Sequence, residues 1–131
     1  MLRFYLFILP VILLSEPNVL WFEEFSGSGE ESIGHFILTC DDNGFLQVGE
    51  TYDYTNLSSK ILVVKINASG QLLWSREIFS GEHNLGNSAI ELGDGYLICG
   101  GIDQNSALIK LDKDNGETIS VSYTHLRAHE T

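Results

Sequence analysis

The sequence predicts an all-β protein built from two four-stranded antiparallel units, and three observations support this prediction. Short apolar runs rich in β-branched residues, such as residues 61–66, alternate with turn residues. Thirteen glycines against two prolines in 131 residues suit a chain with many tight turns. Finally, the same order of strands and turns occurs twice along the chain, which indicates an internal repeat.

Two tryptophans and two turn glycines set the period of this repeat. Trp21 and Trp74 are 53 residues apart, and Gly44 and Gly95 are 51 residues apart. Repeats of this length are typical of propeller blades, each of which has four strands joined by hairpins. Because closed propellers have about 4–8 blades, we expect two four-stranded antiparallel blades of an incomplete β-propeller.

The first element, residues 1–15, is typical of a signal peptide. Arg3 precedes an apolar run over residues 4–14, and Ser15 follows as a small residue near a cleavage point. The run is shorter than the ~20 residues of a membrane span. The pattern predicts export to the cell envelope or the extracellular space, with an uncleaved anchor or a buried strand as the alternatives.

The two repeats follow within residues 16–119, at about 20–71 and 72–119. Asn43-Gly44 and Asp94-Gly95 predict type I′ hairpin turns, one in each unit. A glycine marks a second turn in each unit, at residues 69–70 and 115–116. The loop over residues 50–60 is longer than its counterpart around Gln104, so we expect it to be the most exposed element of the first blade.

The last element, residues 120–131, departs from the repeat. Ser120 stands where the first unit places Trp74, and residues 121–131 resemble the conceptual translation of a sequencing adapter. We therefore expect the second sheet to lack its outer strand or to borrow tail residues for it. His125 and His129 have helical spacing but lack the further ligands of a zinc site, so no metal site is predicted there.

Charge and cysteine content bound the partners. A net charge of −11 argues against nucleic acid as a partner, because phosphate binding needs clustered Lys and Arg. Cys40 and Cys99 lie in apolar strand-like runs. They can pair after export or remain free, and a buried free cysteine is the more common outcome in such a run.

The phrases DDNGFLQVGE, ILVVKINASGQLLW, GDGYLICGG and ALIKLDKDNGE resemble a bacterial extracellular propeller family over about residues 20–119. The resemblance implies a secreted or surface-attached protein and no defined activity. Residues 67–74 also resemble the tryptophan-docking motif of pyrroloquinoline-quinone dehydrogenases, in which a Trp four residues after a turn glycine packs between blades. No residue of the chain matches the cofactor-binding residues of those enzymes, so no cofactor is predicted.

Polar clusters suggest no catalytic, cofactor or metal site. The run from Asp112 to Gly116 is one residue short of a calcium loop, and an Asx turn explains it. His35 and His83 do not occupy matching repeat positions, since His35 aligns with Asn87. The acidic pairs Glu23-Glu24 and Glu30-Glu31 are interpreted as a solvated rim.

The expected function is that of an exported, non-catalytic propeller fragment that acts as a binding or display scaffold for a cell-surface or extracellular ligand. Its other expected partners are further C-terminal blades of the same protein. The alternative is a truncated quinoprotein-like oxidoreductase whose catalytic residues lie in missing blades.

Overall fold

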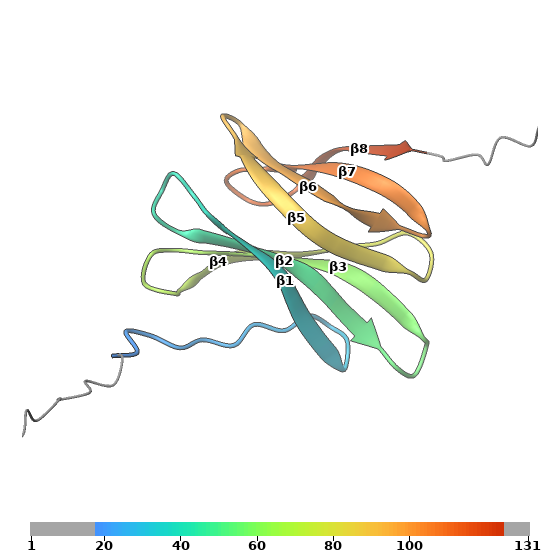
Figure 1. The fold of residues 1–131 in the computed structure, drawn as a ribbon, viewed down its shortest axis with the longest axis horizontal. Helices are drawn as coiled ribbons and strands as arrows, with labels where there is room; N and C mark the ends of the chain where they lie inside the picture. Colours follow the sequence, from blue (N-terminus) through green and yellow to red (C-terminus); the bar gives the residue numbers. More distant parts are fainter. Residues whose placement is uncertain (1–17, 125–131) are drawn as a thin grey trace, which may run out of the picture.

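The computed structural model describes residues 18–124, which form two four-stranded antiparallel sheets (Figure 1). Sheet 1 has the strand order β1-β2-β3-β4 and sheet 2 the order β5-β6-β7-β8. The strands are β1 (Glu31–Thr39), β2 (Phe45–Asp53), β3 (Ser58–Ile66), β4 (Leu72–Ile78), β5 (Asn84–Leu92), β6 (Gly95–Ile102), β7 (Asn105–Asp112) and β8 (Thr118–Thr124).

This architecture confirms the predicted fold class. The sheets do not close into a ring, and the arrangement is consistent with two blades of an incomplete propeller. The sheets are offset by one strand from the sequence units, because β4 pairs with β3 in sheet 1 although its residues open the second sequence unit. The second sequence unit therefore begins with the last strand of sheet 1.

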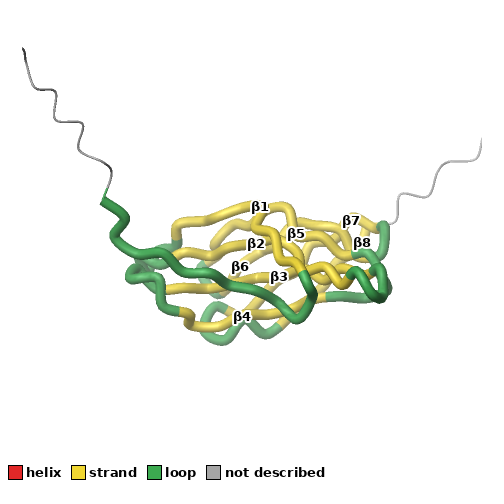
Figure 2. The backbone as a smooth tube through the Cα atoms, turned by 90° about the horizontal axis from the view of Figure 1, so that it is seen from below, coloured by secondary structure: helices red, strands yellow, loops and turns green. Residues whose placement is uncertain are grey.

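The core lies between the two sheets, where β5 packs across β1, β2 and β3 (Figure 2). We call the face of sheet 1 that meets sheet 2 its front, and the opposite face its back; sheet 2 meets sheet 1 with its back, so its own front points away. The alternation of side chains along each strand puts every second residue on the same face. The buried side chains between the sheets are Leu46, Val48, Ile61, Val63, Trp74, Ala89, Tyr96, Ile98, Ala107, Ile109 and Leu111.

Trp74 docks β4 onto sheet 2. Its ring lies 6.1 Å from the ring of Tyr96, and only 8% of the residue is exposed. Gly116 makes room for the indole: a Cβ at this position would lie 2.5 Å from Cε3 of Trp74, and the backbone has a φ of +71° that favours glycine. The predicted blade-to-blade position of this tryptophan is thus present in the structure.

The same arrangement occurs on the back of sheet 1. Trp21 lies 6.2 Å from the ring of Phe45, and its Cε3 would be 2.7 Å from a Cβ on Gly70, where φ is +84°. The inter-ring angles are also alike, 54° at Trp21 and 53° at Trp74. One docking geometry therefore serves two positions of the repeat.

The predicted type I′ turns are wrong at both positions. Asn43 has a φ of 63° but Gly44 is outside the left-handed region, and Cys40 accepts a hydrogen bond from the N–H of Asn43 at 3.0 Å. This pattern is a type I turn followed by one left-handed residue, which is a common three-residue hairpin. Asp94 likewise lacks a positive φ.

The type I′ geometry occurs instead in the β6–β7 hairpin. Asp103 and Gln104 have φ values of 46° and 70°, and the flanking residues Ile102 and Asn105 are paired. Neither residue is glycine, so the sequence held no strong signal for this turn.

The predicted long loop over residues 50–60 is mostly strand. The β2–β3 ladder continues to the pair Asp53–Ser58, so only residues 54–57 form the loop. Tyr54 and Leu57 at its tip are 54% and 63% exposed. The extent of the loop was predicted wrongly, because Thr51, Tyr52 and the polar residues before Ile61 extend the ladder.

Buried polar groups tie the two sheets together at one end. Asn84, 1% exposed, donates from Nδ2 to the carbonyl of Ser59 at 2.7 Å, and its N–H donates to Ser59 Oγ at 2.9 Å. At the other end, Glu91 Oε2 accepts from the N–H of Asp41 at 2.8 Å. Burial opposes ionisation of Glu91, but Lys113, 2.8 Å away, and the Asp41 N–H hold its pKa below the ordinary value.

A lysine–aspartate pair is repeated in both sheets with different burial. Lys65 lies 2.7 Å from Asp42 with only 2% of its side chain exposed, because sheet 2 covers it. Lys110 lies 2.8 Å from Asp94 and is 27% exposed. The hydrogen bond from Lys65 holds the pKa of the Asp42 carboxyl below its ordinary value.

Sheet 2 borrows tail residues for its outer strand, as one of the two sequence-based alternatives predicted. In β8, Ser120 pairs with Lys110 in the same register in which Trp74 pairs with Lys65. The position predicted for a tryptophan is therefore correct in the structure, although serine occupies it.

The paired lysines generate a first stability prediction. Asp42→Asn should lower the free energy of unfolding by about 1–3 kcal/mol, because it leaves a buried ammonium without its carboxylate. Lys65→Met should be nearly neutral, because it removes the buried charge together with the need for a partner. Asp94→Asn, the matched change in the exposed pair, should stay within about 0.5 kcal/mol in urea unfolding. Equal losses for Asp42→Asn and Asp94→Asn would contradict the role of burial.

The docking of Trp74 generates a second prediction. Gly116→Ala should destabilise the chain by about 2 kcal/mol, because a side chain at positive φ is strained and the new Cβ collides with the indole. The control is Gly93→Ala, where no atom lies within 4 Å of the new Cβ. Tryptophan emission during urea unfolding measures both variants, and a Gly116→Ala midpoint matching that of the control would refute the docking role.

Candidate functional site

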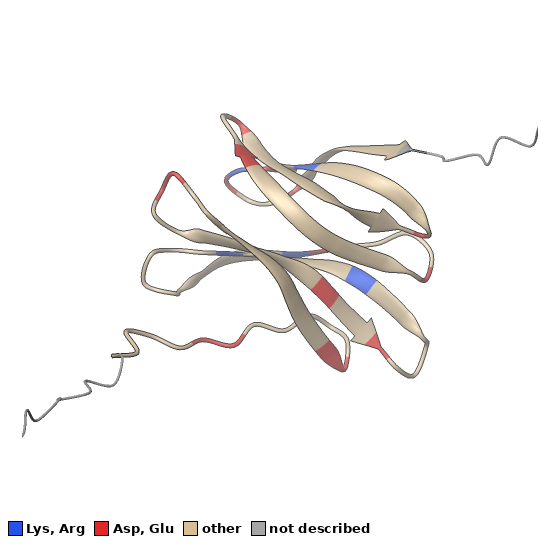
Figure 3. Ribbon diagram, viewed as in Figure 1, with Lys and Arg blue, Asp and Glu red and all other residues tan. Residues whose placement is uncertain are grey.

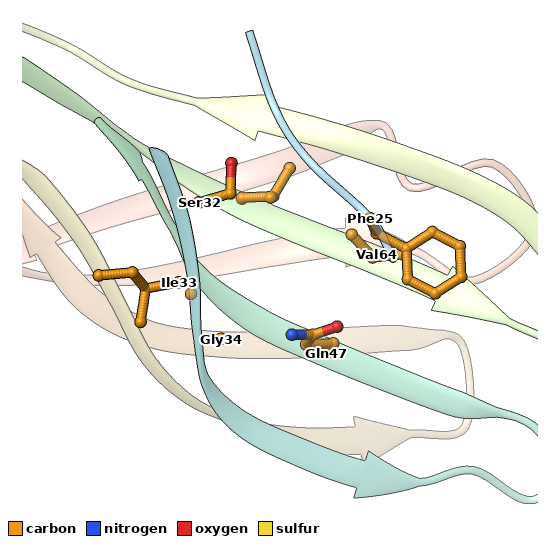
Figure 4. A pocket seen from close by; sticks show the side chains of 8 residues that line it. Phe25, Ser32, Ile33, Gly34, Gln47 and Val64 are labelled. Atoms are coloured by element: carbon orange, nitrogen blue, oxygen red, sulfur yellow. The ribbon is translucent and has the colours of Figure 1, made fainter. Parts of the chain in front are cut away.

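A small recess lies on the back of sheet 1, around Gln47 (Figure 4). A cavity of about 30 Å³ opens between β1, β2, β3 and the extended segment that precedes β1. Figure 4 shows the amide of Gln47 between Gly34 on β1 and Phe25 of that segment. The lining residues are Phe25, Ser32, Ile33, Gly34, Gln47, Gly49, Leu62 and Val64.

The size of this cavity limits what it can bind. A volume of about 30 Å³ holds one or two water molecules and no organic ligand. Two shallower depressions of about 330 and 450 Å³ adjoin it and share Gln47 with it. The back of sheet 1 is therefore an uneven open face, suited to contact another surface and not to enclose a small molecule.

The extended segment, residues 18–29, borders the face and is held by polar contacts at its end. The N–H of Gly27 donates to Ser32 Oγ at 2.9 Å, and the N–H of Gly29 donates to Thr51 Oγ1 at 2.9 Å. Phe25 packs on the back-face cluster of Leu62, Val64 and Ile66. This anchoring could not be predicted from the sequence, because its donors are backbone groups.

Glu77 and Lys60 fix the same segment from sheet 1. Both carboxylate oxygens of Glu77 accept from Ser28, and Lys60 Nζ lies 2.9 Å from Glu77 Oε2. Burial opposes ionisation of Glu77, but these contacts together hold its pKa below the ordinary value. The carboxylate of Glu77 and the ammonium of Lys60 thus both anchor this segment to sheet 1.

The histidines weighed from the sequence lie apart in the fold. His35 is an extra residue of the β-bulge in β1, and its Nε2 is 3.4 Å from Glu50 Oε1. Asn87 holds the matching bulge in β5, which confirms that it aligns with His35. His83 lies in the β4–β5 connection and is exposed. The structure brings none of them together into a site.

The acidic motifs have structural roles where the structure describes contacts for them. Asp112 Oδ1 accepts from the N–H groups of Asp114 and Asn115, which confirms the Asx turn. Glu30 accepts from the N–H of Tyr54 at 2.9 Å, and Glu31 accepts from the Tyr54 hydroxyl, so the pair braces the β2–β3 loop. Figure 3 shows acidic residues at the loops of both ends of the sheets.

Across residues 18–124, no three acidic, His or Cys side chains gather as metal ligands, and no helix could cross a membrane. Glu23 and Glu24 are exposed. The predicted signal segment, His125 and His129 lie outside the described residues.

The cysteines do not pair. Both cysteines are free. Cys40 is buried, as the more common outcome for a cysteine in an apolar strand predicts, whereas Cys99 is exposed, so the expected burial is wrong for Cys99. Burial raises the pKa of the Cys40 thiol, so this thiol stays protonated. Cys99 lies on the front of sheet 2, in register with Ser88 and Leu108.

Comparisons with known proteins add no relative. No protein-family model matches the chain, and no curated protein or solved structure is significantly similar to it.

Proposed function

We propose that this chain is part of an exported, non-catalytic β-propeller that serves as a binding or display scaffold in the cell envelope or outside the cell. Its partners in this proposal are an extracellular or cell-surface ligand, which binds to the loops, and further blades of the same protein. In this proposal the chain belongs to the bacterial extracellular propeller family that its repeat resembles.

The observation that carries this proposal is that one framework supports loops of different length. The β2–β3 loop has four residues, 54–57, whereas the matching β6–β7 loop has two, Asp103 and Gln104. The tryptophan docking is nevertheless the same in both sheets to within 0.1 Å, at 6.2 and 6.1 Å between ring centroids. Loops that vary over a constant framework are where binding residues are found in scaffold folds.

The β2–β3 loop also has the side chains of a recognition element. Tyr54 is 54% exposed and stacks edge-on against Tyr52, with 4.8 Å between ring centroids. Glu30 and Glu31 hold Tyr54 by its N–H and its hydroxyl. A rigid, exposed tyrosine presents a large contact area at a low cost in conformational entropy.

The first test is the tolerance of the framework to a changed loop. Replacing residues 54–57 with Asn-Gly should change the free energy of unfolding by less than about 1 kcal/mol, because a two-residue I′ turn closes a ladder of this register. The matched control deletes Ser69 and Gly70 from the β3–β4 turn, which should destabilise the chain because Trp21 rests on Gly70. If the loop exchange unfolds the chain in urea as readily as the control does, the scaffold proposal fails.

The second test concerns export and chemistry. The full chain fused before a phosphatase that is active only outside the cytoplasm should give active reporter in a bacterial host, and Leu6→Arg with Ile12→Arg should abolish it by breaking the apolar run. Fusion protein that is made but stays inactive in the cytosolic fraction would contradict export. Titration of the chain with pyrroloquinoline quinone and Ca²⁺ should show no binding by calorimetry, and a bound, redox-active quinone would contradict the non-catalytic proposal.

A further inference from the structure

The two outer faces of this molecule correspond, by position in the repeat, to the two faces that pack against each other in its core. The front of sheet 1 packs on the back of sheet 2. The front of sheet 2 and the back of sheet 1 have the same strand registers as those faces and are left without a sheet partner. The inference below rests on the propeller repeat in the proposed function, and it places a second copy of this chain where that proposal places further blades of the same protein.

The front of sheet 2 matches the front of sheet 1 row by row. In sheet 1, Leu38, Leu46, Lys65 and Trp74 stand side by side across the four strands. In sheet 2 the corresponding row is Ile90, Leu97, Lys110 and Ser120. The row is covered in sheet 1 but open in sheet 2, where Ile90 is 54% exposed.

The next row shows the same contrast. Val48 and Val63 of sheet 1 are fully buried between the sheets. Cys99 and Leu108 hold their places in sheet 2, where Cys99 is exposed and Leu108 is 43% exposed. The front of sheet 2 therefore exposes apolar residues at positions that are buried on the front of sheet 1.

The back of sheet 1 keeps the features that receive a sheet. On sheet 2, Gly86 allows close approach, since a Cβ there would lie 2.5 Å from Val48 Cγ1 of sheet 1. Gly34 is the matching residue of β1, and the atoms nearest to a Cβ there belong to the side chain of Gln47. The glycine is thus present at the same position on both backs, next to Gln47 on sheet 1 and next to the neighbouring sheet on sheet 2.

The polarity of the two open faces also matches. Gln47 on the back of sheet 1 replaces Ile98, which is fully buried on the back of sheet 2. On the front of sheet 2, Ser88 replaces Phe36, and the exposed Ser106 lies on the same strand as Leu108. The Gln47 amide and the Ser88 hydroxyl are polar groups that can form hydrogen bonds across such a contact when a second sheet covers them.

The segment before β1 occupies the position of a fourth strand on the back of sheet 1. Trp21 and Phe25 contact the back of sheet 1 at the spacing at which Trp74 and Ile78 contact sheet 2. Residues 20–25 therefore lie where the fourth strand of a preceding sheet would lie, without a neighbouring strand. Sheet 2 has a fourth strand, but Ser120 stands there in the position that corresponds to Trp74.

We propose that the chain binds a second copy of itself head to tail: the front of sheet 2 of one copy covers the back of sheet 1 of the next, and residues 20–25 of the second copy take the place of β8 beside β7. Only one strand can pair with the outer edge of β7, so the incoming segment displaces β8 and brings Trp21 to the position of Ser120. This contact is heterologous, so repeating it leads to a ring or an open chain of copies.

Within one molecule the two parts cannot meet. Phe25 packs on the back of sheet 1, whereas sheet 2 packs on its front, so sheet 1 separates residues 20–25 from β7 (Figure 1). The net charge of −11 makes copies repel one another, and salt screens this repulsion. Assembly should therefore increase with salt concentration.

Sedimentation and a register-specific disulfide test this proposal on the full chain. The weight-average mass should reach at least twice that of one chain at high protein and salt concentrations. Leu108→Glu should restore the single-chain mass, because it places a carboxylate on the covered face. Leu57→Glu, the matched change at a loop tip, should assemble like the original chain. A single-chain mass for the original protein under all conditions, or equal loss in both variants, would overturn the proposal.

The disulfide arm fixes the geometry. Arg76 pairs with Val63, so residue 23 of one copy should face residue 108 of the next. In a Cys99→Ala background, Glu23→Cys with Leu108→Cys should oxidise to covalent multimers, whereas Glu82→Cys with Leu108→Cys should not. Covalent dimers from Leu108→Cys alone would reveal front-to-front pairing and overturn the head-to-tail geometry. Failure here leaves the export and loop-exchange results standing, so the two proposals fail separately.

Discussion

The fold depends on one contact, the packing of a tryptophan from the last strand of one sheet onto the turn glycine of the next. A four-stranded sheet of this length cannot bury both of its faces by itself, so each sheet needs a neighbour. Trp74 places a large aromatic ring in that contact, and Gly116 makes room for the ring because it carries no Cβ. Lys65 is buried because this contact places sheet 2 over it.

Much of the fold could be predicted because strands and tryptophans repeat at a regular period. The strand positions, the two second-turn glycines and the match of Ser120 to Trp74 all follow from that period. Turn type could not be predicted from the Asn43-Gly44 pair, because one extra residue in the hairpin changes which positions need a positive φ. The type I′ turn at Asp103 and Gln104 carries no glycine to mark it.

The recess on the back of sheet 1 could not be predicted in the same way. It depends on where residues 18–29 lie, and backbone donors at Gly27 and Gly29 hold this segment. Backbone groups are present at nearly every position, so they leave no mark in a sequence. Gln47 could have been noticed as a polar residue in the repeat position of Ile98, but only once the strand register was known. The sheets' offset from the sequence units hid the relation between Trp21 and a missing fourth strand.

The placement of each tryptophan ahead of its glycine also sets an order of events during synthesis. Trp74 is made 42 residues before Gly116, an interval of about 2–8 s at ordinary elongation rates of 5–20 residues per second. During that interval β4 is completed at Ile78, and the strands of sheet 2 that cover the front face of sheet 1 are still being added. Sheet 1 is therefore made before the sheet that covers its front face, and this apolar face stays exposed until sheet 2 has been added.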